Sequence, residues 1–189
     1  GIRGANVLRR GNAPSGQAVV HLCDSIFKSH RLQVRSSYAA EALAAAHNLD
    51  GTYPTLVTIH ELERGPLTPT QLRDIRDGKH KGGLCIKVSL TIDAESVYKS
   101  LSSKDLKIPT ERTLLGHISW IRELMDHGIV HNVQWCETRD MTAGGHTKGS
   151  IERDSLIEVM SGIQSFKHGV KQCVPFRGGR GIYDRHKSV

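Results

Sequence analysis

Apolar and polar residues alternate in short runs along the first third of the chain, which predicts β-strands. Residues 2–8 and 17–23 are rich in strand-forming side chains, and residues 30–35 alternate between polar positions and Leu or Val. The Pro- and Gly-containing segment 11–16 between the first two runs has the composition of a turn. We therefore expect an antiparallel meander of three strands.

A helical pattern follows this strand-rich region. Ser36 or Ser37 is a suitable N-cap for the Ala-rich run 38–49, whose residues have the highest helix propensity. Gly51 and Pro54 interrupt the pattern before it resumes, because Pro cannot donate a backbone hydrogen bond inside a helix. We expect a long helix that is kinked or broken at these residues.

The rest of the chain alternates between strand and helix patterns. Apolar runs rich in β-branched residues predict strands at 84–92 and 129–136. Apolar residues at intervals of three and four, together with capping signals, predict helices at 69–76, 94–101, 112–128 and 150–165. This order of elements is typical of a mixed α/β fold, and we expect a five-stranded mixed sheet flanked by helices.

Length and charge add a domain organisation. The 189 residues suit one domain, which we place at 1–165, followed by a basic C-terminal tail at 166–189 that is extended or mobile. The net charge of +7 is concentrated at the ends: residues 1–35 and 166–189 each carry +5, and residues 36–165 carry −3. Basic ends suit a polyanionic partner, although flanks that only aid solubility explain the charge equally well.

Several classes of protein are disfavoured by composition. No apolar run approaches the roughly 18 residues of a membrane-spanning helix, so we expect a soluble chain. The four cysteines include no C-x-x-C pair and the eleven histidines no H-E-x-x-H motif, so we expect no zinc site. Unpaired cysteines favour a reducing compartment, hence an intracellular protein in the cytoplasm or nucleus. The chain opens on Gly1 rather than Met, which we interpret as an excerpt or a processed product.

Two carboxylates occupy positions where a site can form. Asp93 directly follows an apolar strand, and ligands gather at the carboxyl ends of such strands, but the position suits a helix cap equally well. Glu41 lies one turn into a helix of small residues that would not screen it. An ordinary solvated Glu near a helix N-terminus fits the same pattern.

Four segments form a more specific combination: RSSYAAEALAAA, TIDAESVYKSL, PTERTLLGHISWIRELMDHGIV and VQWCETRDMTAGGHTKG. They contain the elements SS-x-A-A-E, D-A-x-S-x-Y and A-x-G-x-T-K-G, each unspecific alone. In this order and spacing they resemble the ribonuclease H (RNase H) domain of copia-type LTR retrotransposon Pol polyproteins, over about residues 2–160. The resemblance implies the family's βββαβαβα fold.

The resemblance also implies an activity, the Mg²⁺-dependent hydrolysis of RNA in RNA–DNA hybrids beside a reverse transcriptase. In this family four carboxylates hold two Mg²⁺, one activating water and the other stabilising the leaving oxygen. Glu41 matches the carboxylate of the first helix and Asp93 the carboxylate after the fourth strand. Both are therefore predicted to be catalytic and metal-binding.

The other two carboxylate positions depart from the family pattern. They fall on Gly4 and Gly144, which have no side chain to bind a metal, while Asn6 and Asp140 lie nearby but off the motif. Losing a ligand that acts in the transition state commonly costs orders of magnitude in rate. We therefore expect a degenerate active site, doubtful Mg²⁺ binding and impaired hydrolysis.

The alternative is a catalytically inactive RNase H-like module, retained as a structural subunit or for binding protein or nucleic acid. Candidate nucleic-acid contacts are Arg9, Arg10, Arg35 and Lys148, because cations in these flanks and motifs can hold phosphates. The expected partners are an RNA–DNA hybrid or another nucleic acid, or a larger protein assembly. No small-molecule substrate is expected.

Overall fold

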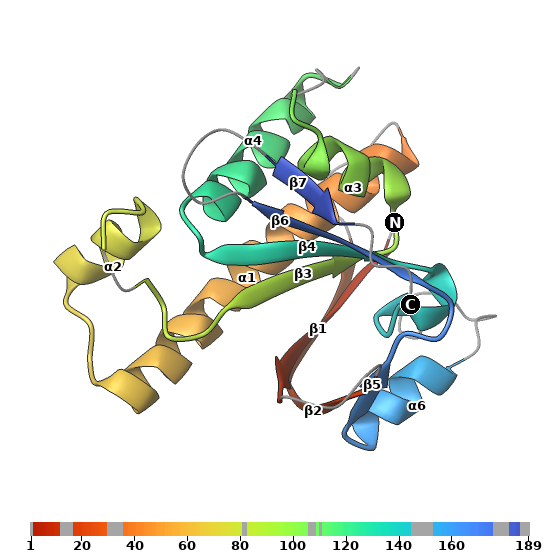
Figure 1. The fold of residues 1–189 in the computed structure, drawn as a ribbon, viewed down its shortest axis with the longest axis horizontal. Coiled ribbons are helices and arrows are strands. Elements are labelled where there is room, and N and C mark those ends of the chain that lie inside the picture. Colours follow the sequence, from red (N-terminus) through yellow and green to blue (C-terminus); the bar gives the residue numbers. More distant parts are fainter. Residues whose placement is uncertain are drawn as a thin grey trace.

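The computed structural model describes residues 2–11, 17–29, 36–80, 83–105, 109, 111–144, 153–175 and 182–185. These residues form a mixed α/β fold with two β-sheets (Figure 1). The fold class predicted from the sequence pattern is confirmed at this level. The described strands lie in two sheets, with the orders β1-β2-β5 and β3-β4-β6-β7, rather than in the single five-stranded sheet expected.

The smaller sheet is built on a long hairpin. β1 (Ile2–Arg10) and β2 (Gln17–Ser29) are antiparallel, and the short strand β5 (Ile163–Ser165) pairs with the start of β2. The first two strands expected from the alternating pattern are therefore confirmed and are longer than predicted. The third expected strand, at 30–35, lies outside the described residues.

α6 (Asp154–Met160) is shorter than the helix expected over 150–165, of which residues 150–152 lie outside the described part of the chain. Gly162 has a φ of 85°, a conformation that glycine adopts at little cost, and it turns the chain from α6 into β5. A helix reaching residue 165 is therefore wrong, because its expected last turn pairs with β2 instead.

α1 (Ser37–Arg64) is one continuous helix. The Ser36 hydroxyl caps it by accepting a hydrogen bond from the Ala39 N–H at 3.1 Å. The break expected near Pro54 does not occur. Leu49 and Leu56, on either side of Pro54, are both buried in the main core, and this packing holds the two halves of the helix in one direction.

The short helix α2 (Pro69–Arg76) is confirmed as predicted. Thr68 and Gln71 form a reciprocal capping box, in which the Gln71 N–H donates to the Thr68 hydroxyl and the Gln71 side chain accepts from the Thr68 N–H. Figure 1 shows α2 beyond the far end of α1, away from both sheets.

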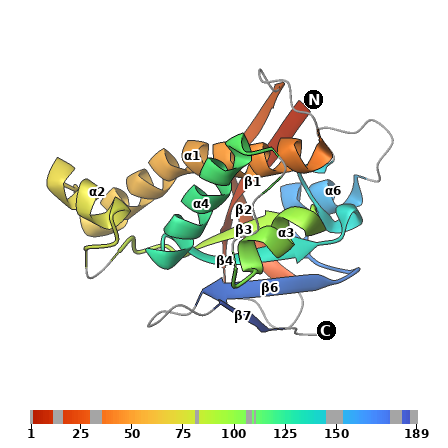
Figure 2. The same ribbon diagram turned by 90° about the horizontal axis from the view of Figure 1, so that it is seen from above.

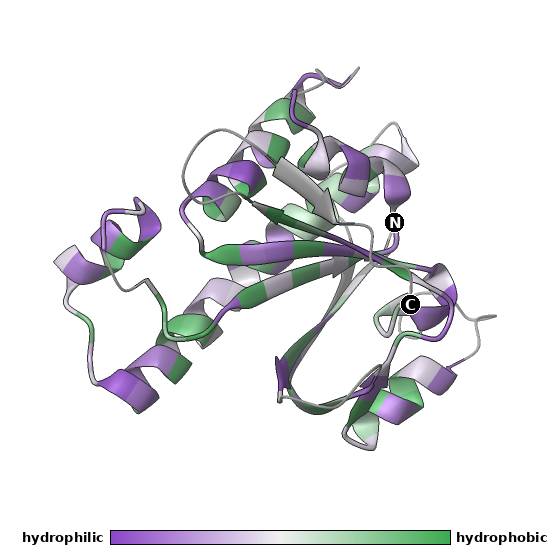
Figure 3. Ribbon diagram, viewed as in Figure 1, coloured by the Kyte–Doolittle hydropathy of each residue, from purple (hydrophilic) through white to green (hydrophobic). Residues whose placement is uncertain are grey.

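The larger sheet begins with two parallel strands, β3 (Val88–Ile92) and β4 (Val130–Cys136). The helices α3 (Glu95–Ser102) and α4 (Thr113–Asp126) connect them. Figure 2 shows α1, α3 and α4 together on one side of this sheet. Figure 3 shows apolar and polar residues alternating along β3, in agreement with its alternating burial.

The larger sheet is completed by the C-terminal segment. β6 (Val170–Pro175) pairs antiparallel with β4, and β7 (Ile182–Arg185) pairs with β6. The segment 166–189, expected to be an extended or mobile tail, thus contributes two strands. Cys173 of β6 is fully buried in the main core, so β6 is part of the folded body.

The main core lies between the three helices and the larger sheet. It is formed by apolar side chains of α1, α3, α4, β3, β4 and β6; its most deeply buried members include Val97, Leu101, Ile118, Ile121, Met125, Val130, Val133 and Cys173. None of the helices in the described ranges is long and apolar enough to cross a membrane.

Candidate functional site

Asp93 lies half-buried at the carboxyl end of β3. The N-cap of α3 is Ala94, so Asp93 does not occupy the capping position that one interpretation of the sequence assigned to it. The Asp93 carbonyl oxygen accepts a hydrogen bond from the Trp135 indole N–H at 2.9 Å. This contact joins the ends of β3 and β4. It thereby connects two of the four segments that resemble the RNase H domain, residues 91–101 and 133–149.

The Cys136 thiol lies at the same end of the larger sheet and is buried. Burial raises its pKa to about 12, and the negative charges of Asp93 and Asp140 contribute to the same shift. The thiol therefore stays protonated at neutral pH, and its Sγ lies 3.9 Å from the Met141 sulfur. A protonated, enclosed thiol is a packing group and not a nucleophile.

Glu41 is exposed on α1, although its neighbours Ala42 and Ala45 are buried. The start of α1 contacts α3, because the Tyr38 hydroxyl donates a hydrogen bond to Ser100 Oγ at 3.1 Å. The structure thus places the first resemblance segment against the second, although it records no shared ligand for Glu41 and Asp93.

Gly4 and Gly144 lie at the two positions where the sequence resemblance predicts carboxylates. Gly4 lies in β1, and Gly144 follows β4 and donates its N–H to the Met141 carbonyl. Between them, Asn6 donates to the Thr142 hydroxyl at 3.2 Å and accepts from Ser25. The tertiary structure therefore brings the first strand next to the loop that carries the A-x-G-x-T-K-G element.

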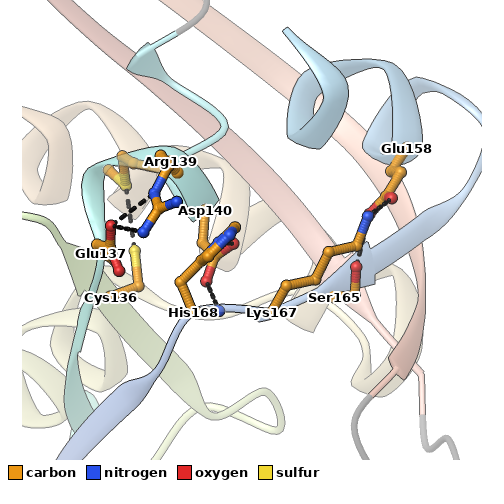
Figure 4. Close-up of polar contacts among 9 residues, drawn as sticks. Cys136, Glu137, Arg139, Asp140, Glu158, Ser165, Lys167 and His168 are labelled. Carbon is orange, nitrogen blue, oxygen red and sulfur yellow. Dashed lines mark hydrogen bonds and ion pairs between the residues drawn. The ribbon is translucent and has the colours of Figure 1, made fainter. Parts of the chain in front are cut away.

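Asp140 is the carboxylate nearest to Gly144 along the chain, at the end of the short 3₁₀ helix η1 (Thr138–Asp140). Its side chain is only 4% exposed, and both oxygens accept hydrogen bonds from His168 (Figure 4). The His168 backbone N–H donates to Oδ2 and its ring Nδ1 to Oδ1, each at 2.8 Å. We refer to this pair as the Asp140–His168 clamp.

The residues beside His168 are also anchored (Figure 4). The Lys167 ammonium and the Ser165 hydroxyl both donate to Glu158 of α6. The hydrogen bond from Lys167 has the largest effect on the Glu158 carboxyl and lowers its pKa, and the hydrogen bond from Ser165 lowers this pKa further. The connection between β5 and β6 is therefore fixed at two points, to α6 through Glu158 and to η1 through Asp140.

The predicted nucleic-acid contacts are only partly described. Arg9 is 59% exposed and forms an ion pair with Glu63 of α1 at 2.6 Å, while Arg10 is exposed at the end of β1. Arg35 and Lys148 lie outside the described residues. Of the two described arginines, Arg9 is therefore neutralised by Glu63.

The residues at these positions do not fit a pair of Mg²⁺ ions. Gly4 and Gly144 contribute no side-chain oxygen, and the Asp140 carboxylate is held in place by a hydrogen bond from His168 to each of its oxygens. Magnesium requires nearly octahedral coordination by oxygen atoms. The exposed Glu41 and the half-buried Asp93 supply too few carboxylate oxygens for two such ions. Within the described ranges, no three His, Cys, Asp or Glu side chains are grouped to hold a metal ion.

No protein-family model matches the chain, and neither a curated protein nor a solved structure matches it.

Sequence reasoning missed His168. It lies in the segment expected to be a tail, 28 residues from Asp140, and it has no motif around it. The only signal in the sequence was Asp140 itself, a carboxylate beside an apolar strand. Its partner depends on the pairing of β6 with β4, which local pattern does not specify.

Proposed function

We propose that this chain is a retrotransposon-derived RNase H-like domain that has become a non-catalytic module. The hydrolysis of RNA in RNA–DNA hybrids, which the family performs with Mg²⁺, is impaired in this copy. The module serves a larger assembly as a structural or binding subunit. A single five-stranded RNase H-like sheet belongs to this proposal as the ancestral arrangement; the described strands β1 to β4 now lie in two sheets.

Contacts between distant resemblance segments support the relationship. Tyr38 contacts Ser100, the Trp135 indole bonds the Asp93 carbonyl, and Asn6 bonds Thr142. Each pair joins segments that lie at least 42 residues apart in the sequence. Three of the four segments and the first strand are therefore neighbours in space, as parts of one ancestral active site would be.

The single observation that carries the loss of activity is the Asp140–His168 clamp. Asp140 is the nearest carboxylate able to replace the one missing at Gly144, and it already accepts two hydrogen bonds from His168. To serve a cation at the position of Gly144, this carboxylate would have to turn from the orientation that both bonds fix and so weaken its hydrogen bonds with His168. That cost opposes metal binding.

Cleavage of a labelled RNA–DNA hybrid in Mg²⁺ or Mn²⁺ tests this proposal. We expect no cleavage by the unaltered chain and a gain of at least about 100-fold in the Gly4→Asp/Gly144→Asp variant. A side chain fits at Gly144, where a Cβ would lie 4.0 Å from its nearest neighbour, the Thr138 carbonyl oxygen.

The matched control is Gly4→Asn/Gly144→Asn, which adds side chains of the same size without the charge and should remain inactive. Cleavage by the unaltered chain that Asp93→Asn abolishes would contradict the proposal.

A partner in a protein assembly fits the charges better than a hybrid does. The ion pair between Arg9 and Glu63 removes one of the cations expected to grip phosphates. We expect hybrid binding to be weak at physiological salt. A hybrid affinity that is tight and falls steeply with salt, as release of counterions requires, would favour nucleic-acid binding instead.

A further inference from the structure

A cavity of about 560 Å³ lies between the two sheets. One wall is formed by residues 4–10 of β1 and another by residues 85–91, which include most of β3. Both are runs of seven consecutive residues. Neighbouring side chains of a strand point to opposite faces, so a cavity bordered by consecutive residues lies along the edge of the strand.

Both of these edges are open among the described strands. β1 pairs with β2 only and stands at the end of its sheet, and β3 pairs with β4 only and stands at the end of the other. The free edge of a strand presents a row of backbone N–H and C=O groups that can pair with a further strand. Two such rows border the same cavity here.

The buried side chains that line the cavity are mostly apolar, with uncharged polar groups among them. Gln134 is 3% exposed and accepts a hydrogen bond from the Thr91 hydroxyl at 3.2 Å, and Thr142 is also buried, bonded to Asn6. Amides and hydroxyls both donate and accept, as the peptide groups of an extended chain require.

The two ends of the cavity differ in charge. Asp140 lines one end, near Asn6 and Thr142, with its carboxylate held by His168. The other end lies where the end of β1 meets the residues before β3: Glu63 bonds Arg9 on one side and the Cys85 thiol on the other. Arg10 and Lys87 are exposed at this end and make it basic.

We propose that this cavity is the docking site for an extended peptide strand of a partner protein, with acidic residues at the end near Arg10 and Lys87. The peptide adds to the open edges of β1 and β3 by backbone pairing, and the basic end sets its direction. A nucleic-acid strand fits less well, because its phosphates would need cations along the whole cavity, and Glu63 and Asp140 also line it. The site does not depend on whether the domain hydrolyses RNA.

Selection from a random dodecapeptide library displayed on phage, with the whole chain as target, tests the proposal. We expect enriched peptides with Asp or Glu clustered at one end and β-branched residues in the remainder. The synthetic form of the strongest peptide should lose at least tenfold in affinity for the Arg10→Glu/Lys87→Glu variant. Both substituted residues are exposed, so the variant should fold, as circular dichroism will verify.

The matched control is Lys79→Glu/Lys99→Glu, which changes the net charge equally at exposed lysines that do not line the cavity. It should bind the peptide with less than a twofold change. Hydrogen exchange should show slower exchange of backbone amides in β1 and β3 when the peptide is bound.

Three outcomes would overturn the proposal. They are a selection with no enrichment above background, peptides that bind the Arg10→Glu/Lys87→Glu variant undiminished, and protection from exchange confined to other elements. Displacement of the peptide by single-stranded RNA at low micromolar concentration would assign the cavity to nucleic acid instead.

Discussion

At the residue scale, the polar groups near the carboxyl end of β4 serve the fold. The Asp140 carboxylate accepts two hydrogen bonds from His168. Burial raises the pKa of the Cys136 thiol to about 12, so this thiol stays neutral. The two exposed ion pairs nearby, Arg139 with Glu137 and Lys167 with Glu158, belong to residues that flank the clamp. These contacts hold the connection between β5 and β6 in place.

Replacing Asp140 with Ala should lower the free energy of unfolding by about 1–3 kcal/mol, because the two hydrogen bonds that this buried carboxylate accepts from His168 are lost. Urea unfolding followed by circular dichroism measures this change. Glu137→Ala is the matched control, since it removes an exposed carboxylate one turn away whose ion pair contributes at most about 1 kcal/mol. Equal losses in the two variants would show that the clamp does not stabilise the fold.

At the element scale, packing and turn geometry decide where helices stop. α1 continues through Pro54 because both of its halves are packed in the main core. α6 stops at Met160, where Gly162 turns the chain and Ile163 pairs with Val19 of β2. Helix propensity alone predicts the opposite result at both places. A helix is therefore continued or ended by what its residues contact.

Replacing Pro54 with Ala should stabilise the protein by about 1–2 kcal/mol, since Ala restores the missing N–H donor and removes a steric clash inside the helix. Pro69→Ala is the control: Pro69 is the first residue of α2, where proline is well tolerated, and the change should be below about 0.5 kcal/mol. Thermal unfolding of both variants measures the difference. A destabilised Pro54→Ala variant would contradict this prediction and show that Pro54 stabilises α1.

At the scale of the whole molecule, the C-terminal segment closes the larger sheet. The first four residues of β6 pair with β4, and Cys173 belongs to the main core together with residues of α3 and α4. The basic charge of this segment thus lies on strands of the folded body as well as beyond them. The two sheets meet around the cavity bordered by β1 and β3, where the proposed partner strand would join them.

Replacing Cys173 with Asp should destabilise the protein by more than about 3 kcal/mol or unfold it, because the substitution places a charge in the apolar core. Cys23→Asp introduces the same side chain at an exposed position of β2 and should cost less than about 1 kcal/mol. Urea unfolding compares the two. Equal unfolding midpoints would show that β6 is not part of the cooperative fold.

The sequence by itself determined those elements whose signals are local. The capping residues Thr68 and Gln71, the apolar run of β3 and the helical periodicity of α4 each specify structure through neighbours in the chain. The two glycines at expected carboxylate positions were equally visible, because they can be read from the motifs alone. Local sequence was therefore enough to predict the fold class and to raise the hypothesis that two metal ligands are missing.

Only the tertiary structure decided the features that depend on distant pairing. β6 pairs with β4 across more than 30 residues, and this pairing brings His168 to Asp140 and makes the clamp. The division into two sheets and the cavity between β1 and β3 arise in the same way. Strand pairing joins segments through backbone groups that every residue shares, so the sequence carries little local record of which strands will meet.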